Sequence, residues 1–277
     1  MRLPYHTLDV FTDRVFGGNP LAVFPDAQDI PETDLQRIAR ELNLSETVFV
    51  RPPETDIGTR RVRIFTPGVE VPFAGHPTVG TAFYLVAAGE VELTGDTVTV
   101  ILEENLGPVP VEVTLNEGRP VRAALTAVVP HAETPTGLDR TDLARMIGVA
   151  PDELDVEIPG LSRPLEPIVA SAGLPFLVVP VRDLAVAERA RLDTAAWHEC
   201  LPEGSLTRMV YVVTAGGVGD GVDLHVRMFA PSVGVPDLIR SCWIPAGVHG
   251  RNLASPIISL PTLTGWKPST SLSGSMA

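Results

Sequence analysis

Val71-Pro72-Phe73-Ala74-Gly75-His76-Pro77-Thr78-Val79-Gly80 opens a segment without a charged residue until Glu90, and this segment decides the fold. Pro77 suits the first turn of a helix, and the residue before a proline favours an extended backbone, so we expect His76 at the N-cap. The residues after Pro77 leave almost no polar face, and Gly89 supplies a stop. A helix that is apolar on every side must be surrounded by protein. The sequence therefore predicts a buried central helix.

The start of this helix is a candidate binding site. The first N–H groups of a helix have no carbonyl partner inside it and attract anions, and here they lie beside Gly75 and His76. The positive end of the helix dipole favours the neutral form of His76, which could orient a substrate hydroxyl or amine. The alternative interpretation is a core helix with a capping histidine and no ligand.

Glu46 is the candidate for proton transfer. It lies in Asn43-Leu44-Ser45-Glu46-Thr47-Val48-Phe49-Val50, where an apolar strand begins. A carboxyl group held against apolar surface has a raised pKa, which suits acid–base chemistry near neutral pH. The alternative is a solvated glutamate at the end of a strand.

Composition excludes several classes of protein. The 277 residues are 44% apolar and 20% charged, which is ordinary for a protein with a substantial core. A formal charge of −13 argues against binding to nucleic acid. The N-terminus shows no apolar signal core, and no apolar stretch reaches membrane-spanning length, so we expect a cytoplasmic protein without a membrane partner. The two cysteines and the histidines show no metal-ligand spacing, so no metal site is predicted.

Strands and helices alternate without a regular strand–helix–strand repeat, which predicts an α+β fold. We expect strands over 6–11, 21–24, 47–50, 61–65, 96–103, 109–115, 176–181, 209–214 and 224–229. We expect further helices from Pro31 to about Asn43, over 141–147 with Thr141 as the N-cap, and over 184–192. The turn Asn116-Glu117-Gly118 is a reasonable boundary between domains of residues 1–117 and 118–277.

A short motif occurs twice. Arg63-Ile64-Phe65-Thr66-Pro67 returns as Arg227-Met228-Phe229-Ala230-Pro231. In the first half this strand leads to the buried helix, so a duplicated architecture predicts a second buried helix shortly after Pro231. Chance, or a common strand-and-turn pattern, is the alternative explanation. The two arginines are interpreted as members of structural pairs rather than as catalysts.

Together these motifs resemble the phenazine-biosynthesis isomerase-like family over roughly residues 5 to 236. The resemblance is carried by 17–23, 44–47, 63–67, 73–78, 172–176 and 227–231. It implies a diaminopimelate-epimerase-like fold, in which two similar domains each wrap a curved, mostly antiparallel sheet around a central helix. It also implies a site in the cleft between the domains, a homodimer, and no cofactor.

The resemblance assigns roles to four residues. Glu46 would move a proton between carbons of a small carboxylated substrate, as in trans-2,3-dihydro-3-hydroxyanthranilate isomerase. Gly75 and His76 would bind the substrate, and its carboxylate would meet the N–H groups at the helix start. Asp237 would stand for a family aspartate that binds the substrate from the second half. Ala74 occupies the neighbourhood where epimerase relatives carry a thiol, which argues against a two-cysteine racemase.

After Pro236 the chain departs from the family pattern. The family expects Glu-Asp-Pro-Ala-Thr-Gly-Ser-Ala here, and this chain reads Asp237-Leu238-Ile239-Arg240-Ser241-Cys242. All 34 acidic residues precede residue 238, although at that density the last 40 residues would carry about six. A reading-frame change and a remodelled C-terminus are the two explanations for the tail 237–277. The codons around Pro236 would distinguish them.

Two functions follow from the sequence. The first is a cofactor-independent isomerase that uses Glu46. The second is a catalytically impaired small-molecule-binding or dimeric scaffold of the same family, with an incomplete second half-site. An ordinary structural domain without a ligand is a third interpretation, favoured if Gly75 and His76 face solid core.

Overall fold

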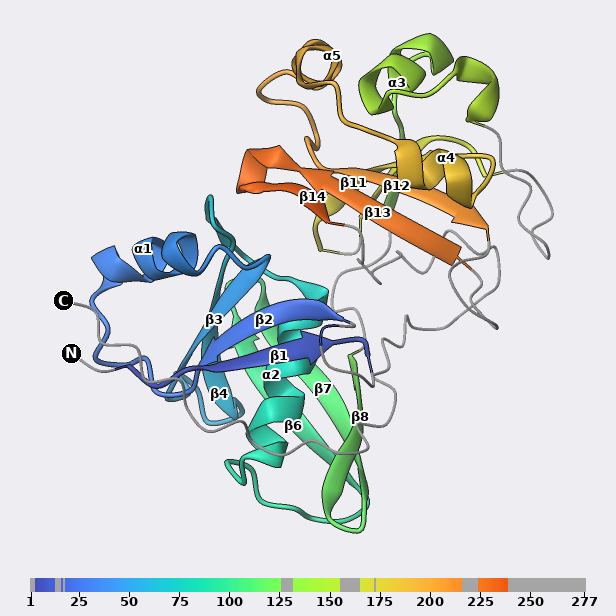
Figure 1. The fold of residues 1–277 in the computed structure, drawn as a ribbon. Helices are drawn as coiled ribbons and strands as arrows, with labels where there is room; N and C mark the ends of the chain where they lie inside the picture. The colour runs from blue at the N-terminus through green and yellow to red at the C-terminus, as the bar shows by residue number, and fades with distance from the viewer. Residues whose placement is uncertain are drawn as a thin grey trace. The chain divides into compact units, whose positions relative to one another are not determined.

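The computed structural model describes residues 3–12, 16, 18–125, 132–154, 165–171, 173–215 and 224–238. The chain forms two units, the first running to residue 128 and the second beginning at residue 129 (Figure 1). The turn at 116–118, expected as a domain boundary, is the hairpin turn between two strands of the first unit. The expected α+β class is confirmed.

The first unit is built on one sheet, ordered β1-β2-β3-β4-β6-β7-β8, with β5 added on β4. The pairs β2–β3 and β4–β6 are parallel and the others are antiparallel. The strands are β1 His6–Val10, β2 Asn19–Phe24, β3 Glu46–Arg51, β4 Arg60–Phe65, β5 Glu70–Val71, β6 Thr97–Glu104, β7 Gly107–Asn116 and β8 Arg119–Leu125.

The sheet curls around helix α2, Gly75–Ala87 (Figure 1). This helix contacts β1 and β8, which lie at opposite ends of the strand order, as well as β2, β3, β6 and β7. Every residue from His76 to Val86 is buried. The central helix predicted from the absence of a polar face is therefore confirmed.

The helix begins two residues earlier than expected. Ala74, with an extended backbone at φ −154°, is the N-cap, and His76 lies in the first turn. The amide and the hydroxyl of Thr78 both donate to the Ala74 carbonyl, at 3.2 and 2.6 Å. These bonds, together with the burial of His76, outweigh the preference of a pre-proline residue for extended backbone. Gly89 has the left-handed backbone (φ 77°) expected where a helix stops.

Helix α1, Glu32–Leu42, covers part of the outer face of this sheet. Its buried residues Leu35, Ile38 and Ala39 pack with Phe24, Phe49 and Phe65. Asn43 ends the helix in the left-handed conformation (φ 51°), as expected from the sequence.

The second unit is a sheet ordered β14-β13-β12-β11-β10-β9, in which only β11 and β12 pair in parallel among the described strands. The strands are β9 Ala132–Pro135, β10 Ile168–Ser171, β11 Pro175–Pro180, β12 Val210–Ala215, β13 Leu224–Ala230 and β14 Val235–Leu238. The helices are α3 Arg140–Ile147, α4 Leu184–Arg189 and α5 Thr194–Cys200, with 3-10 turns η1 Pro151–Glu153 and η2 Pro231–Val233. Asp139, whose carboxylate accepts from the Asp142 amide at 2.8 Å, replaces the expected Thr141 as N-cap of α3.

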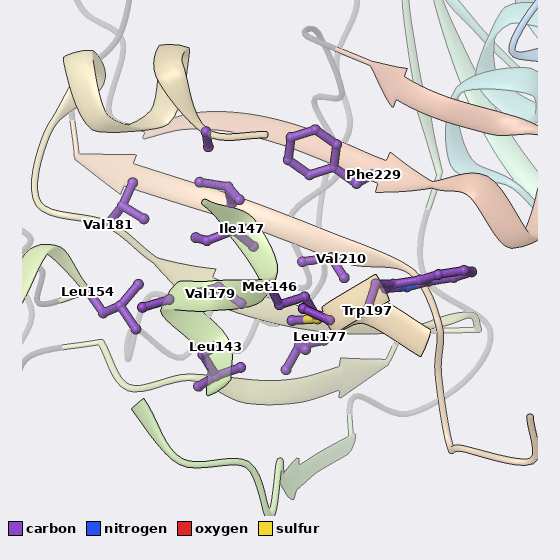
Figure 2. Close-up of a cluster of buried hydrophobic side chains, with 14 of the residues drawn as sticks. Leu143, Met146, Ile147, Leu154, Leu177, Val179, Val181, Trp197, Val210 and Phe229 are labelled. Atoms are coloured by element: carbon purple, nitrogen blue, oxygen red, sulfur yellow. The ribbon is translucent and has the colours of Figure 1, made fainter. Parts of the chain in front are cut away.

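Alternate residues of these strands enter two different cores. Leu177, Val179, Val210 and Phe229 pack with α3, α4 and α5 (Figure 2). The opposite face carries a second cluster, which includes Phe176 stacked on Tyr211 at 4.1 Å between ring centroids. In the described part of the chain this second cluster contains no residue of an α-helix.

The second buried helix expected after Pro231 is not found among residues 231–238, where η2 and the strand β14 follow instead. β14 returns along β13, with Met228 opposite Leu238 and Ala230 opposite Val235. The tail from residue 239 onward lies outside the described residues.

Candidate active site

Glu46 is the first residue of β3 and lies opposite Leu21 in the parallel pair with β2. Its neighbours along the strand, Thr47 and Val48, are fully buried. Glu46 itself is only 8% exposed. Burial raises the pKa of Glu46 to about 7, and the neighbouring Ser45 hydroxyl opposes this rise. The side chain therefore exchanges a proton near neutral pH, as a residue that both removes and returns protons requires.

His76 lies in the first turn of α2, with 7% of its surface exposed. Its Nε2 is 3.2 Å from Glu46 Oε2. Burial lowers the pKa of His76 to about 3, although the carbonyl of Pro20 partly opposes the decrease. The imidazole is therefore neutral near pH 7, so the contact between His76 and Glu46 is not an ion pair. Sequence analysis predicted Glu46 and His76 as site residues, and the fold brings their side chains into contact.

Gly75 contributes backbone rather than a side chain. It is the first residue of α2, and the N–H groups in the first turn of a helix have no carbonyl partner inside the helix. Pro77 has no N–H group, so Gly75 and His76 supply the amides at this end. These amides lie at the positive end of the helix dipole, in the same turn of α2 as the His76 side chain that contacts Glu46.

Asn19 and Ser45 complete the surroundings of His76. Asn19 Nδ2 lies 3.1 Å from His76 Nδ1, and Ser45 Oγ lies 2.8 Å from Asn19 Oδ1 and 2.9 Å from the Pro20 carbonyl oxygen. All three side chains are buried. Sequence analysis assigned no role to Asn19 or Ser45, although both lie in motifs that carry the family resemblance.

Glu104, at the end of β6, is a second buried carboxyl that sequence analysis missed. Its Oε1 lies 2.5 Å from the Thr78 hydroxyl, which is also 2.6 Å from the Ala74 carbonyl oxygen. The hydroxyl has one proton and the carbonyl only accepts, so Thr78 donates to Ala74 and Glu104 donates to Thr78. Burial raises the pKa of Glu104 to about 8, which agrees with a protonated side chain.

Asp237 lies in β14 of the second unit, while Glu46, Gly75 and His76 lie in the first. It accepts two hydrogen bonds from Arg227, at 3.0 Å from Nε and 2.5 Å from Nη2. Arg227 is buried, and its Nη1 also donates to the carbonyls of Ala187, Glu188 and Ala190.

The same arrangement recurs in the first unit. Arg63 on β4 donates through Nε and Nη2 to the carboxylate of Glu70 on the neighbouring β5, with 2.8 Å for the Nη2 bond. Arg63 also lies over the Phe65 ring at 5.3 Å, as Arg227 lies over Phe229 at 5.0 Å. The repeated sequence motif is therefore a repeated structural unit, and both arginines form the structural pairs expected of them.

No group of three or more His, Cys, Asp or Glu side chains in the described residues is arranged to hold a metal ion. Within the same residues, no helix is long and apolar enough to cross a bilayer.

Comparisons with known proteins agree with the motifs. An isomerase of Mesorhizobium japonicum with no assigned reaction is 40% identical over 235 residues, covering 82% of this chain and 72% of that protein. Trans-2,3-dihydro-3-hydroxyanthranilate isomerase of Pseudomonas chlororaphis is 39% identical over 155 residues, covering 56% of this chain and 52% of that enzyme. The matched part thus spans about half the length of the enzyme with a named reaction.

A solved structure shows the same fold. The phenazine biosynthesis protein of the PhzF family from Bacillus anthracis superposes with a TM-score of 0.75 and 26% identity, covering 90% of this chain and 79% of that one. The family model described as phenazine biosynthesis-like protein matches residues 8–237. The chain belongs to the phenazine biosynthesis-like protein family.

Proposed function

We propose that this protein is a cofactor-independent isomerase that moves a proton between carbons of a small carboxylated substrate, with Glu46 as the acid–base residue. The observation that carries the proposal is the buried Glu46 carboxyl, with its pKa raised to about 7, at 3.2 Å from a neutral His76. A carboxyl group with this pKa loses and regains a proton at little cost near neutral pH. Both relatives are named isomerases, one of them with a defined reaction, which supports the isomerase class.

His76 and Gly75 would bind the substrate. The amides at the start of α2 suit a carboxylate, because an anion there interacts with unpaired N–H groups and with the helix dipole. The neutral imidazole would orient a hydroxyl or amine beside Glu46. The substrate of the Pseudomonas chlororaphis enzyme, trans-2,3-dihydro-3-hydroxyanthranilate, carries all three groups and is the first compound to test.

Asp237 is kept as a proposed substrate contact on the family resemblance alone. Its carboxylate is paired with Arg227, so a substrate amine or hydroxyl would have to share Asp237 with the guanidinium. We further propose that the protein forms a homodimer, as the family resemblance implies, and that it acts in the cytoplasm.

The test is the incorporation of solvent deuterium at carbon in a panel of small carboxylates, followed by NMR. We expect exchange with the wild type, and a decrease of about 10²–10⁴-fold in Glu46→Gln, because the amide neither accepts nor returns the proton. Glu112→Gln, at an exposed position on β7, is the matched control and should exchange as the wild type does. Undiminished exchange in Glu46→Gln would remove this residue from the mechanism.

A scaffold protein that binds such compounds without turnover is the second candidate. The observation that favours it is the pairing of Asp237 with Arg227, because an acid that is already neutralised by a buried arginine is less available to a substrate. Binding of a carboxylate detected by calorimetry, with no deuterium incorporation across the panel, would support the scaffold.

A further inference from the structure

The polar atoms around His76 constrain where its protons lie. The Ser45 hydroxyl has one proton and lies within hydrogen-bonding distance of two oxygens, Asn19 Oδ1 at 2.8 Å and the Pro20 carbonyl at 2.9 Å. If Ser45 donates its proton to Asn19 Oδ1, the Ser45 hydroxyl oxygen and the Pro20 carbonyl oxygen face each other without a proton between them, which is repulsive. A half-turn of the Asn19 amide removes the conflict, and such amide orientations are assigned from their networks. Ser45 then donates to Pro20 and accepts from Asn19 Nδ2.

This orientation fixes the histidine as well. The Oδ1 atom of Asn19 now faces His76 Nδ1 across 3.1 Å, and an amide oxygen only accepts, so Nδ1 carries the proton. The Pro20 carbonyl, which likewise only accepts, comes from the same strand β2. Because the ring is neutral, Nε2 is then unprotonated.

The unprotonated Nε2 is the atom that meets Glu46. It lies 3.2 Å from Glu46 Oε2 in a buried setting, and neither atom has a hydrogen-bond partner in the described residues, so the contact is close without being aligned as a hydrogen bond. An acceptor nitrogen beside a carboxylate would be repulsive, whereas a protonated carboxyl group can donate to it. Ser45 and His76 are the polar side chains that interact with Glu46, and the ring of Phe11 lies edge-on to the imidazole at 6.4 Å.

We propose that Asn19 and Ser45 are positioning residues that hold His76 as the Nδ1–H tautomer, so that an unprotonated Nε2 faces the carboxyl group of Glu46 and favours its protonated form. Glu46 therefore holds a proton in the resting protein. Once a substrate displaces the contact, the acid would give this proton to one carbon, and the resulting carboxylate would take a proton from another. The catalytic meaning of this arrangement rests on the proposed function, but the tautomer itself does not. The other tautomer would donate from Nε2 and favour ionised Glu46 instead.

The test reads the tautomer directly in the absence of substrate. Two-bond proton–nitrogen NMR spectra of the ¹⁵N-labelled full chain distinguish a protonated Nδ1 from a protonated Nε2, and His76→Gln identifies the His76 signals. We expect Nδ1–H in the wild type and in Ser45→Thr, which keeps the hydroxyl. Ser45→Ala releases the Asn19 amide, so we expect a mixture of tautomers.

A second variant, Asn19→Leu, deletes the acceptor itself and leaves the Ser45 hydroxyl in place. In this variant we expect carboxyl ¹³C titration to show a lower pKa of Glu46, because an Nε2–H donor favours the ionised form. A wild-type His76 protonated at Nε2 would overturn the inference, and so would an unchanged tautomer in both Ser45→Ala and Asn19→Leu. The expected tautomer without deuterium exchange into any substrate would leave this inference standing while the proposed function fails. Deuterium exchange that depends on Glu46, in a protein whose His76 is protonated at Nε2, would support the proposed function and overturn this inference.

Discussion

Two buried carboxyl groups of the first unit share a raised pKa but have different partners. Glu46 meets the imidazole of His76, and Glu104 meets the hydroxyl of Thr78. His76 and Thr78 lie two residues apart in the first turn of α2. Burial is the main cause of both shifts, so each group carries its proton near neutral pH more often than a solvated glutamate does.

Glu104 makes stability depend on pH. In the folded protein its pKa is about 8, against 4.5 for the reference carboxyl, so between these values the folded state holds a proton that the unfolded state has lost. The contribution is complete below pH 4.5 and is lost as pH rises through 8. We expect the free energy of unfolding to fall with pH more steeply in the wild type than in Glu104→Gln, by up to about 1.4 kcal/mol per pH unit.

Urea unfolding followed by circular dichroism at several pH values between 5 and 9 measures this difference. The glutamine amide can donate to Thr78 as the neutral acid does, so the comparison isolates ionisation. His76 changes stability with pH in the opposite direction, because its lowered pKa destabilises the folded state as pH falls below 6.5. Wild type and Glu104→Gln both retain His76, so its effect cancels in the comparison. Parallel pH profiles would show that Glu104 is ionised in the folded protein.

At the level of secondary-structure elements, α2 approaches β1 and β2 through a glycine. A Cβ atom on Gly80 would lie 2.8 Å from Leu21 Cδ2 and 2.8 Å from Val10 Cγ2, and both side chains are buried. We expect Gly80→Val to lower the free energy of unfolding by about 1–3 kcal/mol, as overpacked cores do. Gly95→Ala is the control, because its Cβ would meet nothing within 4 Å. Equal stabilities in urea would show that the helix moves to make room.

The Arg227–Asp237 pair fastens β13 to β14. The Arg227 side chain is 3% exposed and the Asp237 side chain 37%. Solvent therefore weakens the attraction between the two charges, but without Asp237 the buried guanidinium would have no carboxylate partner among the described residues. We expect Asp237→Asn to destabilise this hairpin by about 1–3 kcal/mol, seen as faster amide hydrogen exchange in residues 224–238. Glu199→Gln, which removes the exposed pair with Arg145, should cost less than about 1 kcal/mol. Unchanged exchange with weaker carboxylate binding would instead make Asp237 a substrate contact.

Sequence analysis succeeded where one segment contains its own signal. The residues of α2 show no polar face, which requires burial whatever surrounds the helix, and the leucine and isoleucine spacing of α1 is equally local. The Asn19–Ser45–His76 contacts were not predictable, since they join residues 26 and 57 positions apart through the parallel register of β2 and β3. The strand β14 was not predicted, because the repeated motif suggested a helix after Pro231. In the structure Arg227 on β13 instead pairs with Asp237 on β14, the neighbouring strand of a hairpin.

For the whole molecule, net charge bears on how substrates arrive. The formal charge of −13 repels an anionic substrate at long range, although the start of α2 attracts it locally. Salt screens the long-range term, with a Debye length of roughly 30 Å at 0.01 M and 8 Å at 0.15 M. We therefore expect kcat/KM for a carboxylate substrate to rise as salt increases over this range. The methyl ester of the same compound is the control and should show no trend.

A decrease with salt would mean that the local positive field of the site dominates capture. The salt dependence therefore distinguishes the rate at which a substrate reaches the site from the affinity of the site for it.

The placement of His76 on a helix without a solvent-facing side has a consequence for durability. The imidazole cannot be uncovered by the fraying of a surface loop, because α2 is enclosed by strands from both ends of its sheet. Only cooperative loss of the whole first unit would separate Glu46 from His76. On heating, the first unit should therefore keep its chemistry until it melts, and inactivation and melting should share one temperature.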